Sequence, residues 1–265
     1  MQIVEQHEVS PALAALFDLS GPTVPRAMNV LEGSTRGMIL ADDPASPRWA
    51  AVYGLAFGTL YLGGPIDAPL LAKLLARCRR LGDVGIGCWP GSELSALLPP
   101  DPAYDGRALF FAERSAPVPL APLAGALAEG YSLAVRDARL LAQSPDLADT
   151  LAAFGSAEAI LRHTLGVVAL RERAVCCEAA TGAPAHGRIE VGVTTLEAHR
   201  RRGLALSACA LLIGMCEARG YATWWDCASQ NVASARLAYA LGYRHPREYR
   251  YVWWPHTEGE GNLHE

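Results

Sequence analysis

The segment from residue 188 to residue 219 constrains the fold more than any other part of the sequence. Residues 188–195 alternate apolar side chains with polar or small ones, which is typical of a strand with one buried face. Residues 204–219 are apolar at helical spacing, and Gly220 is suited to a left-handed stop after them. The basic turn Arg200-Arg201-Arg202-Gly203 joins the two patterns. The order strand, glycine-containing turn, helix predicts an α/β fold.

The turn between these elements has the chemistry of an anion site. A helix N-terminus leaves about four amide N–H groups unpaired and carries partial positive charge, so it can bind a pyrophosphate. Gly203 allows close backbone approach, Ala205 keeps the first helical turn uncrowded, and the arginines attract a polyanion. Taken alone, the hexapeptide from Arg200 to Ala205 fits a solvated basic loop better. Its place between a strand and a helix favours the anion site.

The rest of the chain divides at a proline-rich seam. With 265 residues, 51% of them hydrophobic, the chain can form one large domain or two ordinary ones. Prolines 99, 100 and 102 open an irregular stretch, and residues 116–122 resemble a linker, so we expect domains at 1–118 and 119–265. In the first domain we expect strands at 37–40, 49–62 (broken by two glycines) and 84–88, and a helix at 68–81. In the second we expect further strands at 131–136, 167–170, 174–180, 223–227 and 248–253, and helices at 145–165 and 232–241.

Composition indicates which partners, location and metal sites to expect. The net charge of −4 and the lack of a basic tail make nucleic acid an unexpected partner. No apolar run approaches the roughly 20 residues of a membrane span, and the N-terminus lacks a secretory pattern, so a cytoplasmic protein is expected. The seven cysteines include no CxxC pair, which favours buried free thiols and no metal site. Nothing in the sequence indicates an oligomeric state.

Two blocks of sequence resemble the GNAT superfamily of N-acetyltransferases. Arg200, Gly203 and Ala205 match the superfamily signature of Arg or Gln, two residues, Gly, one residue, then Gly or Ala. The second block runs over residues 225–237 and closes with Leu-Gly-Tyr at 241–243. The resemblance implies the GNAT fold, with a mixed α/β sheet, in the C-terminal half. The N-terminal half is interpreted as a degenerate GNAT-like lobe, and the details are most similar to the zwittermicin-resistance-type branch.

The resemblance implies an acyltransferase that uses acetyl-coenzyme A (acetyl-CoA) as co-substrate. An amine of a small molecule would attack the thioester directly in a ternary complex, in a gap between two splayed strands. Backbone N–H groups of residues 193–195 would polarise the thioester carbonyl. The residues expected to bind the coenzyme are Val193, Thr194, Thr195, Arg200, Arg201, Arg202, Gly203, Leu204, Ala205, Asn231 and Ser234.

Glu190 is the candidate catalytic base, because an amine that is protonated near neutral pH must lose a proton before it attacks. The alternative is a carboxylate paired with an arginine on the sheet surface. The position of the general-acid tyrosine found in many family members is Ala238 here, and the neighbouring Tyr239 is expected to be a packing residue. Asn231 fits a helix N-cap as well as a coenzyme ligand. His199 is expected to be an exposed loop residue that could touch phosphate.

Two other functions stay open at this point. A catalytically silent acyl-CoA-binding module would bind the same coenzyme to regulate something else, and the absence of the family tyrosine favours it slightly. An enzyme that uses a longer acyl or an aminoacyl donor is the third possibility, and the negative net charge counts against a tRNA donor. The sequence carries no recognisable code for the acceptor.

Overall fold

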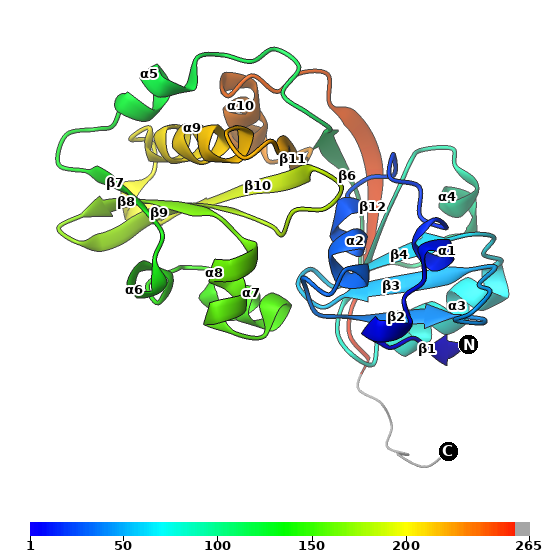
Figure 1. Ribbon diagram of the computed structural model, residues 1–265. Helices are drawn as coiled ribbons and strands as arrows, with labels where there is room; N and C mark the ends of the chain where they lie inside the picture. Colours follow the sequence, from blue (N-terminus) through cyan, green and yellow to red (C-terminus); the bar gives the residue numbers. More distant parts are fainter. Residues whose placement is uncertain (258–265) are drawn as a thin grey trace. The chain divides into compact units, whose positions relative to one another are not determined.

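The computed structural model describes residues 1–257 and divides the chain into two compact units (Figure 1). The first unit is Met1–Ala108 together with the residues after Arg247, and the second is Leu109–Arg247. Both units combine helices with a mixed sheet, so the α/β class expected from the sequence is confirmed. None of the helices within residues 1–257 has both the length and the apolar character needed to cross a membrane.

The first unit is built on a sheet with the strand order β1-β2-β3-β4-β5-β12, in which only the β4–β5 pair is parallel. Its core lies between this sheet and α3, where apolar side chains at helical spacing are buried. Its strands are β1 (Gln2–Ile3), β2 (Gly37–Ala41), β3 (Ala50–Gly54), β4 (Thr59–Gly63), β5 (Val84–Cys88) and β12 (Arg247–Trp254). Its helices are η1 (Gln6–Glu8), α1 (Pro11–Ala14), α2 (Pro25–Leu31), α3 (Ala68–Cys78) and α4 (Glu93–Leu97).

The second unit has the strand order β11-β10-β9-β8-β7, in which only β10 and β11 run parallel. β6 (Tyr104–Phe111) begins in the first unit and ends in the second. The other strands are β7 (Ser132–Val135), β8 (Gly166–Arg171), β9 (Ala174–Thr181), β10 (Arg188–Thr195) and β11 (Ala222–Ala228). The helices are α5 (Leu120–Gly125), α6 (Ala138–Leu141), α7 (Leu147–Phe154), α8 (Ala157–His163), η2 (Glu197–His199), α9 (Leu204–Glu217) and α10 (Val232–Ala240).

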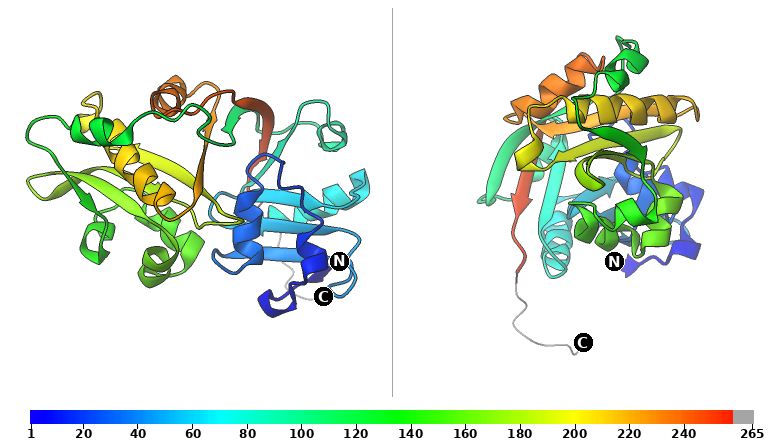
Figure 2. Two further views of the ribbon diagram at one scale, coloured as in Figure 1. Left: turned by 45° about the horizontal axis from the view of Figure 1, so that its top comes forward. Right: turned by 90° about the vertical axis from the view of Figure 1, so that its left-hand side faces the viewer.

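Helix α9 is apolar on nearly every side because it is covered from two directions. One face packs on β8, β9 and β10 in the main core of the unit. The opposite face meets α5, where the Ser207 hydroxyl donates to the carbonyl of Leu123 at 3.0 Å. Figures 1 and 2 show α9 on one face of the sheet and α6, α7 and α8 on the other. A sheet covered by helices on both faces explains why β8 is a continuous apolar run.

The structure departs from the expected division of the chain in four respects. The units separate at 108/109, before the predicted seam at 118/119, and β12 pairs with β5 of the first unit. β6 was not predicted, because the prolines at 99, 100 and 102 just before it indicated an irregular stretch. α5 occupies part of the expected linker. The assignment of separate roles to residues 1–118 and 119–265 therefore stays a prediction.

Candidate active site

The turn before α9 leaves the N-terminus of the helix open. Arg201 and Gly203 both have left-handed backbones, with φ of 59° and 76°. Gly203 is the N-cap, no side chain caps the helix, and a Cβ at this position would meet nothing within 4 Å. Within the described chain, the amides of residues 202–206 have no hydrogen-bond acceptor. A row of unpaired N–H groups at the positive end of a 14-residue helix is suited to a diphosphate.

Strands β10 and β11 separate next to this helix end. Their parallel pairing stops at Glu190 opposite Trp224, whereas β10 stays paired with β9 as far as Thr195 opposite Cys177. The amide of Leu196 donates to the Cys176 carbonyl, and the Glu190 carbonyl accepts from Gly182, so even-numbered residues of β10 face β9. It follows that Val193 and Thr195 turn their backbone groups into the gap between the strands. Thr194 turns its backbone groups away from the gap.

Glu190 lies on the face of β10 opposite α9. Its neighbours Ile189 and Val191 are buried in the core with α9, and Glu190 is half-buried on the other side. Its carboxylate lies over Gly182, where an added Cβ would be 3.9 Å from Oε2. Gly192 next to it is exposed, and a Cβ there would touch only the carbonyl of Ala180, at 3.9 Å. Glycines 182 and 192 thus add no side-chain atoms beside the carboxylate.

The second block of candidate residues forms the start of α10. Asn231 is the N-cap, and its side chain accepts from the Ser234 amide at 3.1 Å. The Ser234 hydroxyl accepts from the indole N–H of Trp225 at 3.0 Å. Both polar side chains therefore have a structural task at the edge of the gap. Tyr239 packs edge-on against Phe111, with ring centroids 5.4 Å apart, as expected of a packing residue.

The sequence matches the GNAT acetyltransferase family profile over residues 109–252, more than half of the chain. The chain belongs to the GNAT acetyltransferase family. The family implies acyl-CoA-dependent acetyl transfer, and therefore an acyltransferase. No curated protein matches the sequence significantly.

Solved structures share the fold over nearly the whole length of this GNAT chain. A GCN5-related N-acetyltransferase-like protein from Streptococcus suis is 25% identical with a TM-score of 0.69, and the match covers 91% of this chain and 96% of that one. A GCN5-related N-acetyltransferase from Kribbella flavida is 18% identical with a TM-score of 0.53, over 90% and 97% of the two chains. A tandem GNAT protein from the clavulanic acid biosynthesis pathway is 15% identical with a TM-score of 0.59, over 97% and 94%. The two-unit architecture thus recurs in other GNAT proteins.

One polar contact beside the arginine turn was not predicted. His199 is half-buried, and its Nδ1 lies 2.8 Å from the hydroxyl of Tyr131, with the two rings perpendicular. The guanidinium of Arg171 lies 5.8 Å from the ring centre of Tyr131. The expectation of an exposed loop histidine was wrong, because η2 packs His199 against the residue that precedes β7.

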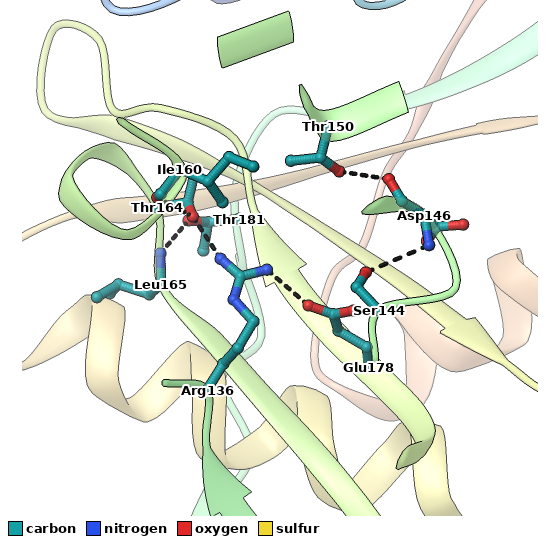
Figure 3. A network of polar contacts seen from close by, with 9 residues as sticks. All are labelled: Arg136, Ser144, Asp146, Thr150, Ile160, Thr164, Leu165, Glu178 and Thr181. Atoms are coloured by element: carbon teal, nitrogen blue, oxygen red, sulfur yellow. Dashed lines mark hydrogen bonds and ion pairs between the residues drawn. The ribbon is translucent and has the colours of Figure 1, made fainter. Parts of the chain in front are cut away.

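A buried ion pair on the Glu190 side of the sheet was also not predicted (Figure 3). Arg136 Nη1 lies 2.6 Å from Glu178 Oε1, and Nη2 donates to the hydroxyl of Thr164. Both charged side chains are only 3% exposed. Glu178 is the cross-strand neighbour of Thr194, so the ion pair lies one strand away from the residues that flank the gap. Alternation alone could have signalled Glu178, a charged residue inside the otherwise apolar strand β9.

Residues 1–257 were expected to hold buried free thiols and no metal ligands. Across residues 1–257, no three or more His, Cys, Asp or Glu side chains gather as metal ligands would. All seven cysteines are buried and free, as expected from the sequence. Burial raises the pKa of the Cys227 thiol near the gap, so at neutral pH this cysteine is a poor nucleophile.

Proposed function

We propose that this GNAT protein transfers the acetyl group of acetyl-CoA to an amine of a small molecule by direct attack in a ternary complex. The observation that carries the proposal is the open N-terminus of α9 beside the gap between β10 and β11. The pyrophosphate would lie on the backbone of residues 201–205 with Arg200, Arg201 and Arg202 nearby. Leu204 and Ala205 supply unpaired amides. Asn231 and Ser234 would border the pantetheine arm.

In the proposed reaction each residue near the gap has a defined task. Backbone groups of Val193 and Thr195, which face the gap, would polarise the thioester carbonyl. Glu190 would accept the proton of the acceptor ammonium, so that the nitrogen lone pair can form the new amide bond as the carbon–sulfur bond breaks. Since Ala238 is fully buried and Tyr239 packs on Phe111, the thiolate leaves without a side-chain acid.

The first unit would then contribute no coenzyme site. We interpret residues 1–118 as a degenerate GNAT-like lobe, with the zwittermicin-resistance-type branch as the nearest relative of the motifs. A second candidate, the silent acyl-CoA-binding module, is favoured only by the burial of Ala238 at the family tyrosine position. It predicts coenzyme binding without turnover of any amine.

Coenzyme binding is tested by calorimetry with acetyl-CoA on the full chain. Gly203→Val should weaken binding strongly, because a β-branched side chain would stand where the pyrophosphate approaches the amides. The matched control is Gly220→Val at the other end of the same helix. Gly220 has φ of 80° and equally open surroundings, so the two variants carry similar backbone strain of roughly 1–2 kcal/mol. Equal affinity of both variants and the parent would rule out this coenzyme site.

Turnover is tested by thiol release with a panel of primary amines. Glu190→Gln should lower kcat/KM by about 10²-fold or more at neutral pH, while acetyl-CoA affinity stays unchanged, because a general base contributes that much. Glu129→Gln, in an exposed loop of the same unit, is the control. Identical rates for Glu190→Gln and the parent between pH 6 and 9 would make Glu190 structural. Binding without turnover of any amine would favour the silent module.

A further inference from the structure

Two arginine-containing turns meet at one end of the sheet in the second unit. The β8–β9 turn holds Arg171 and Arg173, and the turn before α9 holds residues 200–202. The start of β9 brings the two turns close together, because it pairs with the end of β8 at Arg171 and with the end of β10 at Thr195. All five arginines are exposed. The exposed carboxylates in these segments are Glu172 and Glu197, so five positive charges face two negative ones, a surplus of three.

Tyr131 fixes two basic side chains of this cluster. Its hydroxyl contacts His199 Nδ1 at 2.8 Å, and its ring lies 5.8 Å from the Arg171 guanidinium. A hydroxyl can donate or accept, so this contact suits either tautomer of the His199 ring. With Nδ1 occupied, Nε2 is the ring nitrogen left for a ligand. The other local arginine contact, from Arg200 Nε to the carbonyl of Thr195 at 3.2 Å, directs Arg200 toward the strand gap instead.

The charge of this cluster exceeds what a diphosphate at the α9 N-terminus needs. That diphosphate carries two negative charges and can use the helix amides and the arginines at 200–202. Arg171, at the end of β8, and His199, at the end of η2, remain, and both contact Tyr131. The coenzyme of the proposed function has a third phosphate, a monoester on the ribose, with a charge of about −1.5 to −2 near pH 7. Arginine is the side chain best matched to such a group, since its fork can bind two phosphate oxygens.

We propose that Arg171 and His199 form a second anion subsite that selects the 3′-phosphorylated form of the coenzyme, with Tyr131 as the positioning residue for both. The proposal rests on the proposed function, because it concerns the same ligand. It assigns the pyrophosphate and the phosphomonoester to separate groups of residues. The subsite therefore discriminates between coenzyme A and 3′-dephospho-coenzyme A, whereas the α9 N-terminus binds both.

The test is calorimetry of the full chain with coenzyme A and with 3′-dephospho-coenzyme A as the two probes. The parent protein should bind coenzyme A at least about tenfold more tightly, as expected for charge-assisted hydrogen bonds. Arg171→Ala should remove most of the preference for coenzyme A, with His199 retaining the rest, and should leave the dephospho affinity unchanged. Tyr131→Phe keeps the ring beneath Arg171 and removes the hydroxyl, so it should lose part of the preference. Arg173→Ala, in the same turn, is the control for general charge and should weaken both probes equally and slightly.

The outcomes separate this subsite from the proposed function. Equal affinity of the parent for the two probes, or an equal loss of both in Arg171→Ala, would overturn the subsite and leave the coenzyme site standing. Binding of neither probe by a folded parent protein would overturn the proposed function and the subsite together. A preference for coenzyme A that Arg173→Ala abolishes and Arg171→Ala retains would also refute the assignment.

Discussion

Replacing Arg136 with Met should destabilise the second unit more than any exposed ion-pair substitution. Both side chains of the Arg136–Glu178 pair are 3% exposed, so removal of the arginine leaves the Glu178 carboxylate buried with its counter-charge gone. Breaking a buried pair from one side costs about 3–5 kcal/mol. A domain has only about 5–15 kcal/mol of stability, so the single variant should lose a large share of it.

The double variant Arg136→Met/Glu178→Leu should recover most of that loss. Within the described residues, Arg136 Nε and Glu178 Oε2 are buried and have no hydrogen-bond partner. Each such atom costs about 1–3 kcal/mol of desolvation in the folded protein. The intact pair is therefore a weak net stabiliser, and an apolar pair of similar volume should come close to the parent.

Native-state hydrogen exchange of the β8 and β9 amides measures the effect within this unit alone, since the two units need not unfold together. The control is Arg162→Met, which breaks an i,i+4 pair with Glu158 whose side chains are 64% and 80% exposed. It should change stability by about 0.5 kcal/mol or less. A loss of stability in Arg136→Met as small as in this control would contradict the cost of the buried charge, and so would a double variant no more stable than Arg136→Met.

Two further predictions concern the thiols and the stoichiometry. Burial raises the pKa of Cys177 to about 11 and of Cys216 to about 12, so these thiols stay neutral at pH 8. They should react with an aromatic disulfide reagent only after unfolding in guanidinium, when all seven cysteines become accessible. Fast labelling of the folded chain would contradict this prediction. Calorimetric titration should give one coenzyme per chain, because the Asp67 side chain already caps α3 of the first unit by accepting from the Leu70 amide at 2.8 Å; two equivalents would contradict it.

Local patterns in the sequence predicted most of the elements that build the site. β10, α9, β11 and α10 lie within a residue or two of their expected limits, because each is bounded by a glycine or by a change in periodicity. β6 was missed since its sequence contains Gly106 and follows three prolines, and strand pairing outweighs such local signals. The pairing of β12 with β5 depends on contacts far apart in the chain, which a linear pattern does not contain.

Because a linear pattern does not contain contacts between distant residues, the sequence could indicate only some parts of the site. The uncapped helix end at Gly203 and the capped helix end at Asp67 each depend on a few consecutive residues. Each can therefore be predicted from its own short stretch of sequence. Tyr131 and His199 are 68 positions apart, and Arg136 and Glu178 are 42 apart. Each contact exists only because antiparallel pairing aligns β7, β8, β9 and β10 in one register. A shift of one residue in that register would turn Glu178 to the α9 side, so the strand pairing that buries the core also creates the polar surroundings of the gap.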